Sequence, residues 1–148
     1  CKGGKPPLYF NNLWDSSYKL HWDKRVVVFE YFGVVDSFDF LESNRDVYGD
    51  DRFDGLRFQV VLFDQVTEVN YSPKDVKKIA YLDMAAYRSN PHVTVLFTGD
   101  SSLLKKLNSL YSTYVEGRAW PSQFFKNRED VWAQITEKEK DFALKITY

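Results

Sequence analysis

Three apolar runs, each followed by a polar turn and an amphipathic stretch, do most to constrain the fold of this chain. They occupy residues 25–33, 56–64 and 93–98 and are rich in β-branched and aromatic side chains. The second and third runs are nearly continuous in apolar character, which is typical of strands buried on both faces of a parallel sheet. Strand patterns that alternate with helix patterns in this way predict an α/β protein with helices packed on one sheet.

The residues before and within the first run predict an antiparallel hairpin. Apolar and polar residues alternate over 18–22, and Asp23 and Lys24 can form a tight turn into the run at 25–33, which we expect to end at Gly33. The sequence therefore predicts a single mixed sheet that begins with an antiparallel hairpin and continues as βα units.

The predicted helices begin at residues that commonly cap helices. Asp36 or Ser37 can cap the first helix. Ser72 can cap the second, because Pro73 then takes the first helical position and Asp75 completes a capping box. The connections between strands and helices are expected to be short, as in a layered α/β domain.

The length of the chain, 148 residues, is enough for one domain. Residues 1–15 are rich in Gly, Pro and Asn and are expected to form a flexible lead-in, with a single domain over 16–148. Helical spacing returns over 103–114 and 131–135, and a short strand is expected at 123–126 between them.

The charge balance and the cysteine content exclude several classes of protein. With 20 Lys and Arg against 21 Asp and Glu, the net charge is −1, so we expect no binding to nucleic acid. Cys1 is the single cysteine, which excludes an internal disulfide and a Cys-based zinc site and fits a reducing, cytoplasmic compartment. A lipid anchor through Cys1 is the alternative. No apolar run approaches ~18 residues, so no membrane span is expected.

Three segments carry a resemblance to a known family, and they read VVVFEYFGVVDSFDF, DDRFDGLRFQVVLFDQV and PHVTVLFTGD. These segments, and the strand–helix order around them, resemble the STAS-like superfamily and within it the SpoIIAA-like (STAS/Sec14-type) bacterial proteins, over roughly residues 18–136. The resemblance implies a non-catalytic binding or regulatory module without a cofactor, which acts through a protein partner. The Sec14-type likeness and the aromatic fraction of 18% suggest the alternative, a carrier or sensor of a small apolar or lipid-like ligand.

The resemblance also implies a regulatory turn before the second helix. In the anti-anti-sigma factors of this superfamily that turn reads Asp-Ser-Ser-Gly, and one serine in it is phosphorylated. Aligned without gaps, the motif falls on Asn70, Tyr71, Ser72 and Pro73. This sequence departs from the family pattern at three of the four positions, and the usual phosphoacceptor position is Tyr71, with Ser72 beside it.

Five residues are predicted to form a binding or regulatory site: Asp64, Asn70, Tyr71, Ser72 and Ser101. Ligands of α/β sheets bind at the carboxyl ends of the strands, and helix N-termini attract anions. We therefore expect these residues to share one edge of the sheet and to bind a protein partner or a small apolar or anionic ligand. A helix cap without a further role is the simpler interpretation of Ser72. An exposed patch around Tyr71, Ser72 and the lysines of the second helix would favour a protein partner, whereas a deep cavity lined by Phe and Tyr would favour the carrier.

No catalytic residue and no metal site is predicted. The two histidines, His21 and His92, have no Cys or second His at metal-ligand spacing, and no nucleophile–His–acid motif is present. The turn at 98–102 lacks the Gly-Lys-Ser/Thr ending of a phosphate-binding loop. We therefore expect no enzymatic turnover; a hydrolase or transferase built from unassigned polar groups is a third hypothesis, and a homodimer is left open.

Overall fold

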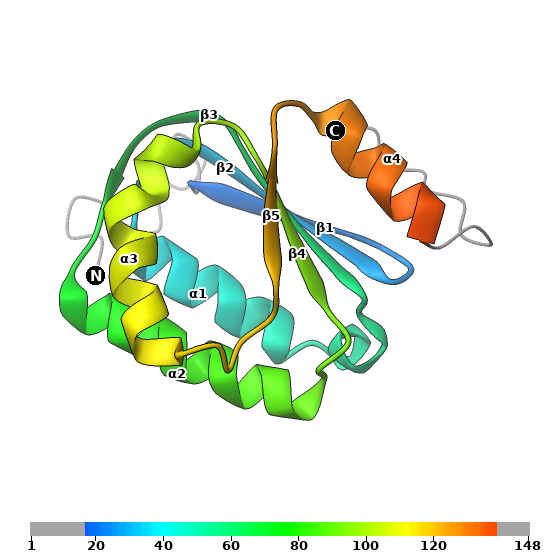
Figure 1. Cartoon of the computed structure of the whole chain (residues 1–148), viewed down its shortest axis with the longest axis horizontal. Coiled ribbons are helices and arrows are strands. Elements are labelled where there is room, and N and C mark those ends of the chain that lie inside the picture. Colours follow the sequence, from blue (N-terminus) through cyan, green and yellow to red (C-terminus); the bar gives the residue numbers. More distant parts are fainter. Residues whose placement is uncertain (1–16, 139–148) are drawn as a thin grey trace, which may run out of the picture.

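A five-stranded mixed sheet, in the order β1-β2-β3-β4-β5, organises the chain (Figure 1). The strands are β1 (Tyr18–Asp23), β2 (Val26–Asp36), β3 (Phe58–Asn70), β4 (Thr94–Thr98) and β5 (Ser122–Phe125). β1 and β2 pair antiparallel and the other neighbouring strands pair parallel, which confirms the predicted N-terminal hairpin and mixed sheet. This computed structural model describes residues 17–138, so the predicted lead-in at 1–15 lies outside the described residues.

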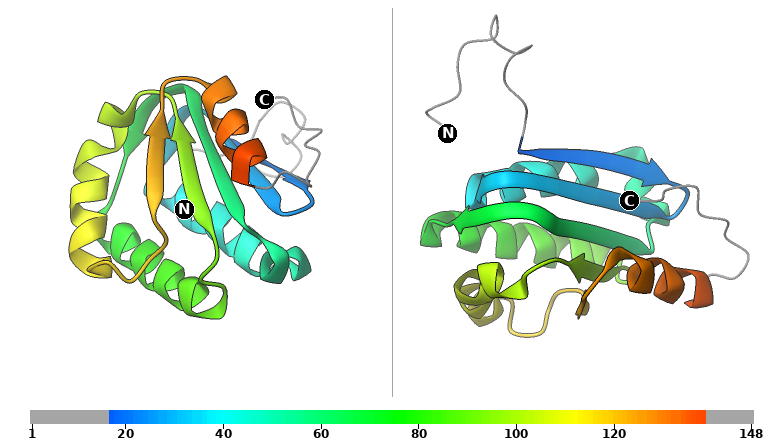
Figure 2. Two further views of the ribbon diagram at one scale, coloured as in Figure 1. Left: turned by 45° about the vertical axis from the view of Figure 1, so that its right-hand side comes forward. Right: turned by 90° about the horizontal axis from the view of Figure 1, so that it is seen from above.

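Helices cover both faces of the sheet, with three on one side and one on the other (Figure 2). The helices are α1 (Ser37–Tyr48), α2 (Pro73–Ser89), α3 (Lys105–Val115) and α4 (Arg128–Lys138), with 3₁₀ turns η2 (Asp51–Gly55) and η3 (Ser101–Leu104). α1, α2 and α3 share the larger core with the sheet, and α4 is the one described helix on the opposite face, where it packs Val131 and Ile135. Within residues 17–138, no helix has the length and apolar character needed to span a membrane.

Two strands run further than the sequence pattern indicates. β2 does not end at Gly33, because Gly33 adopts a φ of +60° and the pairing register with β3 shifts there, so that the strand continues to Asp36. β3 does not end at Asp64 but continues to Asn70, since its second half still pairs with the lengthened β2. The hairpin turn also falls one residue later than predicted, between Asp23 and Val26.

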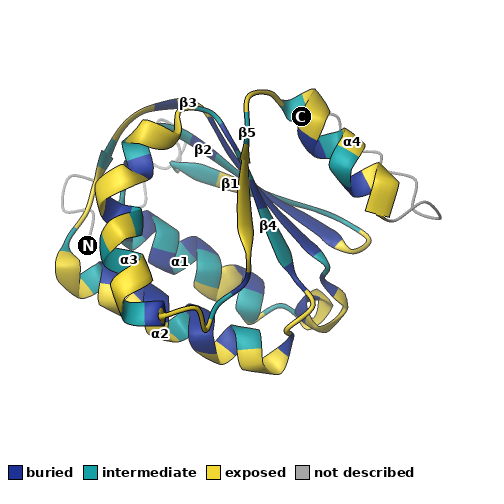
Figure 3. Ribbon diagram, viewed as in Figure 1, coloured by how far each residue is buried: buried dark blue, intermediate teal, exposed yellow. Residues whose placement is uncertain are grey.

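The overhang of β3 beyond β4 determines where the strand ends lie. β4 pairs with β3 only as far as Leu62 and Thr98, and β3 then extends eight residues further, to Asn70. The buried residues concentrate in the central strands and on the inner sides of α1 and α2, as Figure 3 shows. Because β3 extends beyond β4, the loop after β3 leaves the sheet further along the strand direction than the loop after β4.

We expect the slowest amide exchange in residues 58–62 of β3. This part of the strand is buried on both faces and is paired with a parallel neighbour on each side, so its amides open only with the whole sheet. Hydrogen–deuterium exchange followed by NMR tests this, with the overhang at 65–70 as an internal comparison that should exchange faster. Rapid exchange throughout 58–62 would contradict the central placement of β3.

Candidate functional site

The turn from β3 to α2 holds three of the predicted site residues. Ser72 caps α2, as predicted, because its Oγ accepts a hydrogen bond from the backbone N–H of Asp75 at 3.3 Å. The reciprocal half of the predicted capping box is replaced by Ser37 of α1. The N–H of Ser72 donates to Ser37 Oγ at 3.0 Å, and the Ser37 hydroxyl donates to the Asp75 carboxylate at 3.3 Å. The starts of α1 and α2 are thus hydrogen-bonded to each other.

Carboxylates already occupy both of these helix starts. Asp36 caps α1 and forms a capping box with Asp39, with N···O distances of 3.0 and 2.9 Å for the two hydrogen bonds. Asp75 stands in the first turn of α2. Because negative side chains already balance the positive ends of the two helix dipoles, this edge is less suited to an anionic ligand than the sequence suggested.

Asp64 lies apart from this turn, in the middle of β3. Its carboxylate accepts hydrogen bonds from the Thr98 hydroxyl and, at 2.7 Å, from Nε of Arg128 at the start of α4. Five residues of β3 separate Asp64 from Asn70. Ser101 begins η3 just after β4, where Asp100 rather than Ser101 acts as the cap. The five predicted residues therefore do not gather at one edge: the overhang of β3 carries residues 70–72 away from the other two.

Arg128 joins the acidic residues on the α4 face of the sheet. Besides Asp64, it lies 4.0 Å from a carboxylate oxygen of Glu30, and the other carboxylate oxygen of Glu30 lies 3.1 Å from Nε2 of His21. Partly buried ion pairs of this kind position an element more than they stabilise it. The Asp64 carboxylate thus has a structural role, because its ion pair with Arg128 attaches α4 to the sheet. A binding role for Asp64 stays a prediction.

The outer side of α2 presents a stripe of cationic and aromatic side chains, which we term the basic stripe. It consists of Lys74, Lys77, Lys78, Tyr81 and Arg88, all of them exposed. Tyr81 is 54% exposed, and Nζ of Lys77 lies 5.8 Å from the centre of its ring. No exposed carboxylate interrupts the stripe within α2, because Asp75 is bound to Ser37 and Asp83 is buried. Tyr71, 39% exposed, extends the surface at the start of the helix.

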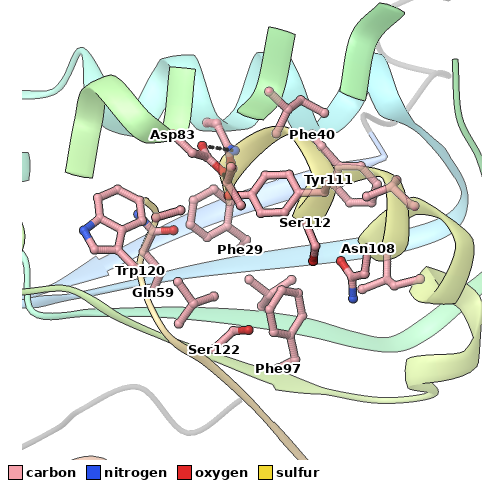
Figure 4. Close-up of a pocket in the computed structure, with 18 of the residues that line it drawn as sticks. Phe29, Phe40, Gln59, Asp83, Phe97, Asn108, Tyr111, Ser112, Trp120 and Ser122 are labelled. Carbon is pink, nitrogen blue, oxygen red and sulfur yellow. Dashed lines mark hydrogen bonds between the residues drawn. The ribbon is translucent and has the colours of Figure 1, made fainter. Parts of the chain in front are cut away.

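A cavity of about 370 Å³ lies between the sheet and the three helices on its larger-core side (Figure 4). Phenylalanine, tyrosine and tryptophan rings form much of its wall, together with aliphatic side chains of β3, β4 and α3. The aromatic residues that line this cavity include Phe29, Phe40, Phe97, Tyr111 and Trp120.

One carboxylate, that of Asp83, is built into the cavity wall. It accepts hydrogen bonds from Asn44 Nδ2 at 3.1 Å and from the hydroxyls of Tyr48 and Tyr111 at 2.7 Å each. Burial raises the pKa of Asp83 to about 6, and the three hydrogen bonds act in the opposite direction. Burial and the nearby carboxylate also raise the pKa of both tyrosines, so the two hydroxyls remain neutral donors.

Two solved structures share this arrangement of strands and helices. One is the anti-sigma factor antagonist SpoIIAA in its unphosphorylated form, with a TM-score of 0.54, 12% identity, and coverage of 81% of this chain and 96% of that chain. The other is the Bacillus cell fate determinant SpoIIAA in its phosphorylated form, with a TM-score of 0.50, 11% identity, and coverage of 80% and 98%. The chain therefore has a SpoIIAA-like fold. No family model matches this chain, and no curated protein does.

The polar residues of the cavity were not predicted from the sequence. Asp83 occupies a position in the apolar stripe of α2, between Ile79 and Met84, where a helix normally buries an apolar side chain. Gln59 likewise interrupts the apolar run of β3 and is buried. A polar residue at a position that the pattern assigns to the core was the available signal for both.

Proposed function

We propose that this STAS-like domain is a non-catalytic regulatory module that binds an acidic surface of a protein partner through the basic stripe of α2. The observation that carries the proposal is the concentration of four cationic side chains on one helix face, with no exposed carboxylate in α2, in a chain whose net charge is −1. Such a patch steers an oppositely charged surface toward it, and the exposed rings of Tyr71 and Tyr81 supply apolar contact area.

The two similar structures support a regulatory role for the domain as a whole. They carry no information on the roles of individual residues. The same fold occurs in an antagonist of an anti-sigma factor, which is a protein named for its action on another regulator. The structure of SpoIIAA is known in an unphosphorylated and a phosphorylated form. A cytoplasmic setting and a homodimer stay predictions for this chain, as does a regulatory role for Ser72 and its neighbours Asn70 and Tyr71.

Photo-crosslinking in the native host tests the proposed surface. Tyr81 and Phe124 are both exposed aromatic residues, at 54% and 43%, and they lie on different elements. Replacing Tyr81 by p-benzoylphenylalanine should yield a discrete crosslinked protein with an acidic contact region, whereas the same replacement at Phe124 should not. The double substitution Lys77→Glu and Lys78→Glu should abolish the crosslink, and Lys105→Glu with Lys106→Glu, on the exposed side of α3, should preserve it. Equal crosslinks from positions 81 and 124 would refute the proposal.

Substitutions of Ser72 should separate its capping role from a regulatory one. We expect Ser72→Ala to lower the free energy of unfolding by about 1 kcal/mol, because one N–H in the first turn of α2 loses its acceptor. Ser72→Asp should retain the cap, since aspartate also accepts this hydrogen bond. Denaturant unfolding measures both effects. If the partner identified by crosslinking binds wild type and Ser72→Asp equally, then the regulatory interpretation of Ser72 is wrong.

A further inference from the structure

The cavity beneath α3 is large enough for a small organic molecule. Its volume of about 370 Å³ is more than twice that of an engineered cavity of about 150 Å³ that binds benzene, and it falls within the range of small-molecule sites. Ser112 and Gly117, at the end of α3 and just after it, are exposed members of its lining, so the cavity reaches the surface there. Its size therefore fits a molecule with two fused rings.

Gln59 supplies a hydrogen-bond donor that the protein itself leaves unused. The side chain is 4% exposed and lines the cavity from the start of β3 (Figure 4). Its Nε2 has no partner within hydrogen-bond geometry among the described residues. The amide faces the Tyr48 hydroxyl, where hydrogen bonding slightly lowers a pKa that burial and Asp83 raise, so this contact is the weakest of the influences on Tyr48. A buried amide without a partner costs free energy, which a ligand with an acceptor at this point would recover.

The charge of the lining excludes an anionic head group. Asp83 is the one carboxylate in the wall, and the lining contains no Lys, Arg or His. An anion would therefore enter an apolar site without a counter-charge and beside a carboxylate. The donors from Asn44, Tyr48 and Tyr111 already satisfy Asp83, so it has no need of a cationic ligand. Fatty acids and phospholipid head groups are thus poor candidates.

The walls favour flat rings over flexible chains. Phe97 stacks on Phe124 at 4.7 Å between ring centres, and Tyr48 meets Trp120 edge to face at 5.6 Å, so aromatic faces and edges already border the space. Such borders form favourable offset or edge-to-face contacts with an inserted ring. Of α3, only Leu107 and Val115 are buried, and the helix has no side-chain cap at its start, which makes it the wall most easily displaced during entry.

We propose that the cavity between the sheet and α3 binds a neutral, flat aromatic molecule that carries a hydrogen-bond acceptor for Gln59 Nε2. This site is separate from the basic stripe, because Ile79 and Asp83 on the inner side of α2 line the cavity while the stripe occupies its outer side. The proposal is therefore independent of the proposed partner, and either can fail without the other.

Three naphthalene probes of nearly equal shape test the proposal by NMR titration of the ¹⁵N-labelled chain. 2-Acetylnaphthalene is neutral and has an acceptor, 2-ethylnaphthalene lacks the acceptor, and 2-naphthoate is anionic. We expect the acetyl probe to bind about fivefold more tightly than the ethyl probe, as one added hydrogen bond implies, and to shift the side-chain amide resonances of Gln59. The naphthoate should bind most weakly. No binding by any probe, equal binding of the acetyl and ethyl probes, or tightest binding of the naphthoate would overturn the proposal.

Substitutions in the lining provide the matched controls. Gln59→Leu should bring the affinities of the acetyl and ethyl probes to within twofold of each other while leaving the chain folded, because it removes only the unpartnered amide. Ala119→Phe should fill the cavity and abolish binding of both probes, whereas Ala85→Phe, on the exposed side of α2, should leave binding unchanged. Preference for the acetyl probe that survives Gln59→Leu would assign the acceptor to another residue and overturn the proposed role of Gln59.

Discussion

Gly99→Ala is expected to lower the free energy of unfolding by at least about 3 kcal/mol, the largest effect we expect from a single methyl group in this chain. Gly99 follows β4 and has a φ of +103°, which side-chain-bearing residues rarely adopt. A Cβ added there would lie 2.7 Å from the carbonyl carbon of Phe63 and 2.9 Å from its carbonyl oxygen. These are backbone atoms of β3, the central strand, and they cannot move aside without distorting the sheet.

Gly117→Ala is the matched control for this effect. Gly117 also has a positive φ, of +77°, but a Cβ there would meet nothing within 4 Å. We expect Gly117→Ala to cost about 1 kcal/mol from backbone strain alone. Denaturant unfolding of the two variants then separates strain from steric clash. Equal losses of stability would show that the contact of Gly99 with β3 is not what requires glycine.

The second large effect is a pH dependence of stability that originates in Asp83. Its pKa is raised from 3.8 to about 6 in the folded chain, so the native state binds this proton more tightly than the unfolded state does. Below pH 4 both states are protonated and the group contributes no penalty. As pH rises from 4 to 6 the unfolded state ionises first and stability is lost, with a full penalty on the order of 3 kcal/mol above pH 6.

Comparison with Asp83→Asn isolates this contribution from the other titrating groups. We expect wild type to lose about 3 kcal/mol relative to Asp83→Asn between pH 4 and pH 7, measured by denaturant unfolding at each pH. Tyr111→Phe should extend the loss to higher pH and enlarge it, because it removes a donor that favours the carboxylate in the folded state and leaves the unfolded-state pKa unchanged. A stability difference between wild type and Asp83→Asn that does not change with pH would show that Asp83 titrates normally.

Features that depend on nearby residues, such as helix caps, could be predicted from the sequence. Features that depend on strand pairing or on packing between elements could not. Ser72 could be recognised as a cap because its hydroxyl acts on its own helix, three residues away. The overhang of β3 could not be recognised, because residues 65–70 expose polar side chains and are held as a strand by their pairing with β2. The predicted meeting of Ser72 and Ser101 fails for the same reason, since it assumes strands of equal length.

The cavity is harder to predict from the sequence than the sheet is. It depends on where α3 rests against α2, and residues from most elements of the larger core contribute to its lining. Among the buried residues of this lining, all but Gln59 and Asp83 have an ordinary apolar core pattern in the sequence. Aromatic abundance could therefore suggest a pocket or a filled core, and only the three-dimensional arrangement distinguishes them.

Because α4 covers one face of the sheet and follows all five strands in the sequence, that face is covered late in synthesis. The larger core is complete once α3 and Trp120 have been made, whereas Val26, Val60 and Leu96 on the opposite face are covered by α4, the last described element. While the ribosome is still adding residues 128–138, the nascent sheet presents this apolar surface to the cell. Emergence of α4 is thus the step that ends the exposure of the nascent domain to aggregation and to chaperones.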